Sequence, residues 1–332
     1  MGLETKEADT NSATVALRPG RALLFVVVGL VLYALLFAGS ELLARRMAAH
    51  NPVHRILTAQ PDGQDWVILG ASHAMPLDFQ GFGAQITQAT GQRVLNLATP
   101  GTGPLYHRFL TERFFATHRA DGVLVVVDSF AFYSEQWNED RFADSDLLSR
   151  TPLDARVLRL FGHFLAHGLD PRALLDYATG FSKINNHERF QPDRWEAEDN
   201  FDRTIRPSAH ADNERIAYLY PQPPDAAVVA RYLDELAALF AVARASGAEV
   251  VVIKPPVPAR FAALFPDEAA FDAALGALLQ REEVAFHDFT DALPDPGFYF
   301  DADHLNRRGA VHFLEAHLAP ILTQVEAQPT QR

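Results

Sequence analysis

The sequence predicts an α/β protein, a three-layer sandwich with about five parallel strands, extended by an N-terminal transmembrane helix and a helical insertion. Short, continuously apolar runs alternate with longer amphipathic stretches, the pattern of a parallel sheet covered by helices on both faces. An uncharged apolar segment lies near the N-terminus, and residues 130–225 interrupt the alternation.

The N-terminal segment is predicted to be a membrane anchor. No charge occurs from Ala22 to Ala38, and the next charged residue is Glu41. At about 1.5 Å per residue, this length is close to the roughly 30 Å of a bilayer core. A buried core helix would normally carry a polar stripe. A cleaved signal peptide has a shorter apolar region, about 7–15 residues, and a clearer Ala-x-Ala exit site. We therefore expect a disordered tail at 1–21 and an anchor at 22–45.

The charges beside this segment leave its orientation open. Equal numbers of basic residues lie on the two sides, so the positive-inside rule favours neither topology. These residues are Lys6, Arg18 and Arg21 before the segment, and Arg45, Arg46 and Arg55 after it.

The rest of the chain alternates between predicted strands and helices. The strands are predicted at Trp66–Leu69, Val94–Leu97, Val123–Val127, Glu249–Ile253 and Val284–Phe286. The helices with the clearest pattern are predicted at Ala226–Ala245, which Gly247 closes, Phe271–Leu279 and Ala310–Leu322.

Residues 130–225 carry aromatic and charged residues but no convincing strand. Structureless loops longer than about 12–15 residues are uncommon in compact domains. We therefore predict a mostly helical insertion in one catalytic domain at 50–326. The insertion is expected to cover the carboxyl edge of the sheet, where open α/β sheets bind ligands.

Composition excludes several kinds of site. The net charge of −13 makes nucleic acid a poor partner. The absence of cysteine removes disulfides, thiolate catalysis and cysteine-bound zinc. His163, His167 and His187 do not have a spacing typical of metal ligands. No metal or cofactor is predicted.

Ser72 is the candidate nucleophile. It follows the first predicted strand, and Gly70 permits a sharp turn between them. Such a turn can lift a serine oxygen above the sheet edge and leave backbone N–H groups free for an oxyanion. The alternative is that the serine simply caps the following helix.

An Asp-x-x-His pattern near the C-terminus supplies the candidate base. Asp301 precedes His304 by three residues, so its carboxylate can reach one ring nitrogen across a turn. Asp303 is the rival partner, but it is also placed to cap a helix that starts near Asn306. Because Ser72 and His304 both follow predicted parallel strands, we expect them at one edge of the sheet.

These segments resemble the sequence blocks of the SGNH/GDSL hydrolase superfamily. Gly70-Ala71-Ser72 is similar to the first block, with alanine in place of the usual aspartate, and Asn96–Gly101 is similar to the second. Asp301–His304 is similar to the last block. The resemblance implies a flavodoxin-like sheet, a Ser72, Asp301 and His304 triad, and an oxyanion hole from the amides of Ser72 and Gly101.

The third block of that superfamily departs from the pattern. It usually reads Gly-x-Asn-Asp, and its asparagine completes the oxyanion hole, whereas this chain has Val127–Ala131. Ser129 or Asn138 could take that place. The loss of one oxyanion donor typically costs about 3–4 kcal/mol of transition-state stabilisation.

The single anchor, altered third block and insertion are similar to membrane-anchored superfamily members linked to O-acylation of envelope or exported polysaccharides. That likeness implies an acyl donor, a carbohydrate acceptor and a multi-pass membrane O-acyltransferase as partner. It also implies a single-pass inner-membrane protein with a periplasmic catalytic domain. The alternative is a non-catalytic binding or assembly protein that uses the same fold.

Other polar residues have weaker assignments. His73 could contact substrate or pack, and Lys254 could bind an anion or remain solvated. A further group could contact sugars or form an exposed polar loop: Asn185, Asn186, His187 and Trp195.

Overall fold

The computed structural model describes residues 19–324 and contains the predicted parallel sheet. Its five strands lie in the order β2-β1-β3-β4-β5, and every neighbouring pair is parallel. This flavodoxin-like order confirms the predicted fold class. The strands are β1 (Trp66–Leu69), β2 (Val94–Asn96), β3 (Gly122–Val126), β4 (Glu249–Lys254) and β5 (Ala285–Asp288).

Both faces of the central strands are buried, which explains their continuous apolar runs. All residues of β1 and β3 are buried. Successive side chains point to opposite faces, so Val67 and Leu69 join one core cluster while Trp66 and Ile68 join the other. A strand with only one buried face would have shown alternating polar residues.

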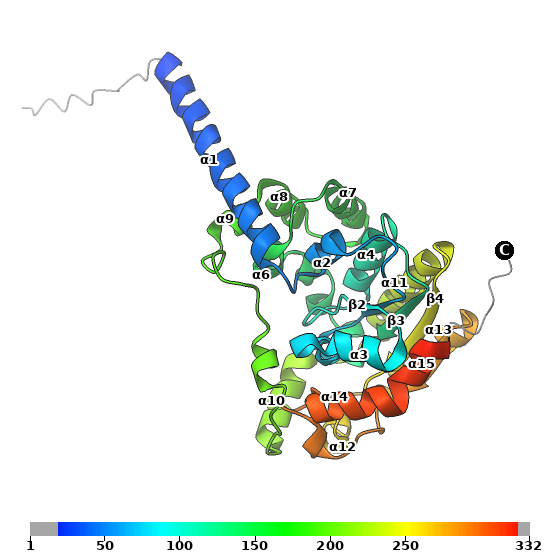
Figure 1. Cartoon of the computed structure of the whole chain (residues 1–332). Coiled ribbons are helices and arrows are strands. Elements are labelled where there is room, and N and C mark those ends of the chain that lie inside the picture. The colour runs from blue at the N-terminus through cyan, green and yellow to red at the C-terminus, as the bar shows by residue number, and fades with distance from the viewer. Residues whose placement is uncertain (1–18, 325–332) are drawn as a thin grey trace, which may run out of the picture.

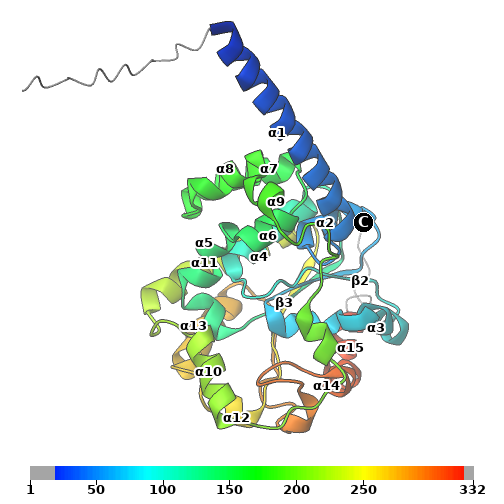
Figure 2. The same ribbon diagram turned by 90° about the vertical axis from the view of Figure 1, so that its left-hand side faces the viewer.

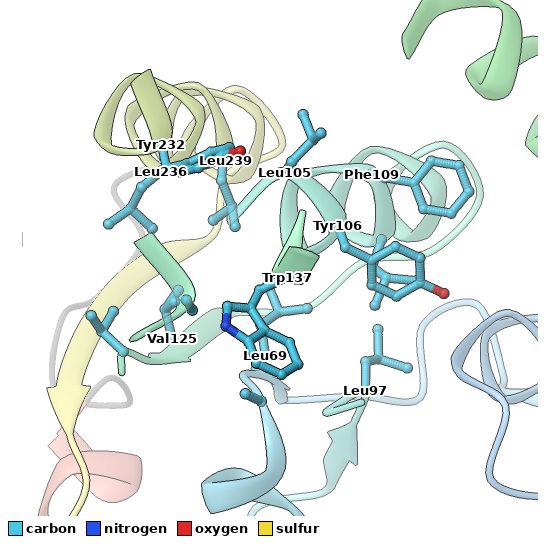
Figure 3. Packing of buried hydrophobic residues seen from close by; sticks show 14 of the residues in the cluster. Leu69, Leu97, Leu105, Tyr106, Phe109, Val125, Trp137, Tyr232, Leu236 and Leu239 are labelled. Atoms are coloured by element: carbon cyan, nitrogen blue, oxygen red, sulfur yellow. The ribbon is translucent and has the colours of Figure 1, made fainter. Parts of the chain in front are cut away.

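Helices cover the two faces as separate layers (Figure 1). The first face is covered by α4 (Pro104–Phe115), α11 (Ala226–Ala245) and α13 (Glu268–Arg281). Figure 3 shows Leu105 and Phe109 of α4, and Leu236 and Leu239 of α11, packed with Leu69 and Val125 of the sheet. The second face is covered by α3 (Phe82–Thr90), α14 (Arg307–Phe313) and α15 (Ala319–Gln324).

The predicted helices are present, with some different boundaries. The helix at Ala226–Ala245 has the predicted bounds, and the one predicted at Phe271 begins at Glu268. The last predicted helix is two α-helices joined by a π-helical turn at Leu314–Leu318. The shorter helices of the domain are α2 (Pro52–Thr58) and α12 (Ala259–Ala262).

Residues 130–225 form helices and contain no strand. They are α5 (Glu139–Phe142), α6 (Ser145–Arg150), α7 (Ala155–Phe164), α8 (Pro171–Thr179), α9 (Phe181–Asn185) and α10 (Ala209–Leu219). In Figures 1 and 2, α7, α8 and α9 lie toward the N-terminal helix, whereas α10 lies at the opposite end of the domain.

The N-terminal apolar segment is part of one long helix, α1 (Pro19–Met47), which projects from the domain (Figures 1 and 2). It is the one helix within 19–324 that is long and apolar enough to span a membrane, and no residue of its most apolar stretch is buried in the domain. The exposure argues against a core helix. The tail predicted at 1–21 lies outside the described residues except for 19–21, which belong to α1.

We expect Gly70→Ala to destabilise the fold, because an added Cβ would lie 2.9 Å from the Cβ atoms of both Ala74 and Val126. Overpacking of this kind typically costs about 1–3 kcal/mol. Gly276→Ala is the matched control, since nothing lies within 4 Å of its added Cβ in α13. It should stabilise the helix by about 0.5–1 kcal/mol. Urea unfolding in detergent measures both, and a Gly70→Ala variant as stable as the parent would contradict the packing argument.

Candidate active site

Ser72 stands at the carboxyl edge of the sheet, directly after β1. It is the first residue of a short 3₁₀ helix, Ser72–Leu77, and the turn before it passes through Gly70. Gly70 has no left-handed backbone conformation. Glycine is needed there for space, because Ala74 and Val126 pack against its Cα. Ser72 remains partly exposed and lines a cavity.

His304 lies at the same cavity and is held by Asp301. Nδ1 of His304 is 2.8 Å from Oδ2 and 3.0 Å from Oδ1 of Asp301. Oδ1 also accepts the backbone N–H of His304, at 2.8 Å, so the turn itself fixes the carboxylate. With Nδ1–H donating to Asp301, the lone pair of a neutral ring is on Nε2, the nitrogen that faces Arg215.

The pKa of His304 is raised above its ordinary value. Burial alone would lower this pKa, but the charges of Asp301 and Asp303 and their hydrogen bonds outweigh burial. The imidazolium that a general base forms during reaction is therefore stabilised at this position.

Arg215 of α10 is a site residue that the sequence analysis missed. Its Nη2 lies 3.4 Å from Oγ of Ser72 and 3.4 Å from Nε2 of His304. No direct hydrogen bond joins Ser72 to His304 among the bonds found in residues 19–324. The guanidinium therefore lies against both reacting side chains. It comes from the insertion, far away in sequence, so no local motif indicates it.

Asp303 is a buried ion-pair centre, not a helix cap. Its Oδ2 accepts from Nε of Arg215 at 2.9 Å and lies 3.2 Å from Nε2 of His73. Its Oδ1 lies 3.2 Å from Nδ1 of His304 without hydrogen-bond geometry. Burial would raise the pKa of Asp303, but His304 and Arg215 hold it well below its ordinary value. The cap of α14 is Asn306, which accepts from the N–H of Gly309.

His73 is buried beneath Ser72 and does not line the cavity. Its Nδ1 lies 2.6 Å from Oδ1 of Asp128, the residue that follows β3 by two positions. Burial would lower the pKa of His73, but Asp128 and Asp303 raise it to about 10. The ring is therefore an imidazolium that binds two carboxylates. Substrate contact or packing was expected for His73 from the sequence, whereas Asp128 belongs to no recognisable motif.

The amides expected to bind an oxyanion lie at the cavity. Ser72 and Gly101 both line it, and neither backbone N–H has a partner among the hydrogen bonds of residues 19–324. Gly101 adopts a left-handed backbone with φ of 58°. An added Cβ would also lie 2.8 Å from the ring of Trp137, so position 101 requires glycine twice over.

The two candidates for the third oxyanion donor are engaged elsewhere. Asn138 is fully buried and donates to the carbonyl oxygens of Ala131 and Ser134. Oγ of Ser129 donates to Oε2 of Glu268 at 2.6 Å. Neither Asn138 nor Ser129 lines the cavity that contains Ser72. These contacts leave Arg215 as the side-chain donor beside Ser72.

Lys254 is neither solvated nor open to an external anion. Its side chain is buried, and Nζ lies 2.6 Å from Oε1 of Glu268 and 2.7 Å from Oδ1 of Asp272. The two carboxylates satisfy its charge within the protein.

The cavity has a volume of about 350 Å³ and combines apolar, aromatic and charged walls. The rings of Trp195 and His50 contact each other in a tilted arrangement, with centroids 4.2 Å apart, and Tyr218 lies beside Trp137. Of the predicted sugar-contacting residues, Trp195 lines the cavity, whereas Asn185, Asn186 and His187 do not. The other lining residues include Met75, Phe79, Pro100, Phe130, Arg194, Glu196, Ala197 and Leu219.

His73, Asp303 and His304 are the group within residues 19–324 that comes nearest to a metal-ligand set. Their ligand atoms lie within 4.8 Å of one another. Each of them already has a protein partner, and Arg215 donates to the Asp303 carboxylate. A divalent cation would face that guanidinium at close range, so this cluster does not fit a metal.

We expect the free energy of unfolding to fall as the pH rises from about 6.5 to 10. The folded chain binds the His73 proton more tightly than the unfolded chain, whose histidine has the ordinary pKa of 6.5. This stabilisation is complete below pH 6.5 and is lost as the pH passes the folded pKa of about 10. One proton gives a slope of at most about 1.4 kcal/mol per pH unit.

Denaturant titrations at several pH values would measure this slope. His73→Gln removes the titrating group and should flatten the curve above pH 6.5, and His163→Gln, on α7, is the control that should not. Equal slopes in the parent and His73→Gln would show that His73 is not the group responsible.

The sequence matches no known family profile and no curated protein. Among solved structures, it is similar to one from Bacteroides fragilis NCTC 9343 described as a putative acylhydrolase. The two chains are 9% identical, with a TM-score of 0.41, and the alignment covers 81% of this chain and 94% of the other. A likeness of this size leaves the activity to be argued from the site itself.

Proposed function

We propose that the protein is a serine-dependent O-acyl ester hydrolase or O-acyltransferase. The observation that carries the proposal is the convergence of Ser72 and the Asp301–His304 pair on one cavity from opposite ends of the domain sequence. A helix-capping serine and a solvated Asp-His loop would have no reason to meet there.

The chemistry follows from the placement of these groups. Oγ of Ser72 attacks the ester carbonyl carbon, and Nε2 of His304 takes the hydroxyl proton. The amides of Ser72 and Gly101 stabilise the negative oxygen. The C–O bond to the alcohol then breaks, and His304 returns the proton to the departing oxygen. Water or a sugar hydroxyl releases the acyl group by the reverse sequence.

We assign Arg215 the role of the missing third-block donor. Its Nη2 lies 3.4 Å from Oγ of Ser72. When Oγ attacks the ester carbonyl carbon, the carbonyl oxygen becomes negatively charged close to Oγ, and Nη2 can donate to it there. A guanidinium is always charged and donates in a fixed geometry. Turning Nη2 from Nε2 of His304 toward that oxygen would free the histidine nitrogen to accept the serine proton.

We further propose an exported or cell-envelope polysaccharide as the acceptor, with α1 as an inner-membrane anchor and a periplasmic catalytic domain. The exposed apolar surface of α1 supports the anchor. The aromatic faces of Trp195 and Tyr218, beside Arg194 and Glu196, suit a sugar chain. A multi-pass membrane O-acyltransferase would supply the acyl group.

The second candidate is a non-catalytic binding or assembly protein of a polysaccharide system. It is favoured by the absence, within residues 19–324, of a direct hydrogen bond between Ser72 and His304, and by the position of Arg215 against both. The same cavity would then bind a ligand without an acyl-enzyme step.

We expect a fluorophosphonate probe to label the protein at Ser72. Ser72→Ala should abolish labelling and reduce hydrolysis of p-nitrophenyl acetate to background, as loss of a nucleophile typically costs about 10⁶-fold in kcat. Ser129→Ala is the matched control, because its hydroxyl is bonded to Glu268 away from the cavity. A parent protein that resists the probe would support the non-catalytic candidate, and undiminished labelling of Ser72→Ala would exclude Ser72 as nucleophile.

We expect Arg215→Ala to lower kcat by about 10²–10³-fold, the usual effect of losing one oxyanion donor, with a smaller change in KM. Arg215→Lys should recover part of kcat, because the charge remains. Arg206→Ala changes an exposed arginine of the insertion that does not line the cavity and should leave kcat nearly unchanged.

Stability must be measured in the same series. Arg215→Ala removes one of the two cations that contact Oδ2 of the buried Asp303, and breaking a buried pair typically costs about 3–5 kcal/mol. Thermal melts identify the fraction that stays folded. An unchanged kcat in folded Arg215→Ala would remove the oxyanion role.

A further inference from the structure

The C-terminal half of α1 is packed firmly against the insertion. The hydroxyl of Tyr33 donates to the carbonyl oxygen of Thr179 at 3.0 Å. The Phe37 ring lies so close to Gly180 that a Cβ there would overlap it. The turn between α8 and α9 is therefore in contact with the apolar part of α1.

A buried ion pair lies farther along the same interface. Nζ of Lys183 is 2.5 Å from Oε2 of Glu41, and Oε1 of Glu41 accepts the N–H of Leu153 at 2.9 Å. Arg45 donates to the carbonyl oxygen of Leu153 at 2.6 Å. Charged groups of this kind belong at the polar boundary of a membrane rather than in its hydrocarbon core.

The length of α1 sets the height of these contacts. The stretch of α1 from Arg21 to Glu41 is about 30 Å long at about 1.5 Å per residue, just enough for a core of about 30 Å. Tyr33 lies about 12 Å before Glu41 on the same scale. The hydrocarbon core cannot end at Tyr33, because the helix from Arg21 to Tyr33 is only about 18 Å long and is too short to span the core. Thr179, which contacts Tyr33, therefore lies on the hydrocarbon side of the membrane boundary at Glu41.

The chemistry of the α8–α9 tip, defined here as residues 175–181, fits this depth. Leu175 and Phe181 are 63% and 61% exposed in the isolated chain. Asp176, the one charge in the tip, accepts hydrogen bonds from the backbone N–H and the hydroxyl of Ser182. The other charges of α8 lie at its beginning, at Asp170 and Arg172.

We propose that the α8–α9 tip inserts into the same membrane leaflet from which α1 emerges, with Leu175 and Phe181 in contact with lipid acyl chains. This inference rests on the proposed role of α1 as an anchor. The bilayer then contacts the domain at two places, so the domain is held at a fixed height and tilt and is not tethered loosely.

Single-cysteine variants can test this, because the natural chain has no cysteine. Nitroxide labels at Phe181→Cys, Leu30→Cys and Leu264→Cys in the full chain, reconstituted in phosphatidylcholine vesicles, report local polarity. Leu30 lies in α1, and Leu264 is an exposed leucine two residues after α12. Helix α12 lies at the end of the domain away from α1 (Figures 1 and 2). Collision with oxygen indicates lipid, and collision with a water-soluble nickel chelate indicates water.

The expected result is oxygen-dominated collision at positions 30 and 181 and nickel-dominated collision at position 264. A lipid signal at position 30 with a water signal at position 181 overturns the inference and leaves the anchor intact. A water signal at position 30 overturns the anchor and the inference together.

Discussion

The buried carboxylate of Asp303 is the constraint on which the site depends. It contacts Arg215 from the insertion, His73 from the turn after β1, and His304 from its own loop. A buried carboxylate without partners costs several kcal/mol, so the fold needs these partners in place. Helix α10 must therefore fold back over the sheet edge to deliver Arg215, and that requirement builds one wall of the cavity. Charge compensation and the shape of the site are consequences of the same contact.

The strand order explains why these groups meet. In the order β2-β1-β3-β4-β5, β1 and β3 are neighbours whose connections leave on opposite faces, so a crevice opens at their carboxyl ends. Ser72 follows one of these strands and Asp128 follows the other. His73, the residue after Ser72, pairs with Asp128 and so ties the Ser72 turn to the segment after β3. The protonated His73 thus stabilises the turn that carries Ser72, and Arg215 contacts Ser72 and His304 from the insertion.

Sequence patterns predicted what depends on local order. Strand positions follow from apolar runs, and the Asp301–His304 contact follows from a spacing of three residues across a turn. Arg215 could not be predicted, because its position depends on how the long insertion folds back over the sheet. Local sequence periodicity carries no information on that path. Asp303 was interpreted as a helix cap because capping is a local rule, whereas its burial is decided by distant residues. Ser129 and Asn138 were considered by proximity in sequence alone, although the hydrogen bonds of both are used within the protein.

The domain has one end next to α1 and an opposite end that carries α10 and one wall of the cavity. Helices α8 and α9 lie beside α1, whereas α10 lies at the opposite end in both views (Figures 1 and 2). With α1 as the proposed anchor, the wall of the cavity that carries Arg215 would be held away from the membrane surface. A lipid-embedded ester would have to leave the bilayer to reach it, whereas a polymer extending into the aqueous compartment would not. Under the proposed anchoring, the attachment of α1 would favour an acceptor in the aqueous compartment over a membrane lipid, independently of the aromatic residues in the cavity.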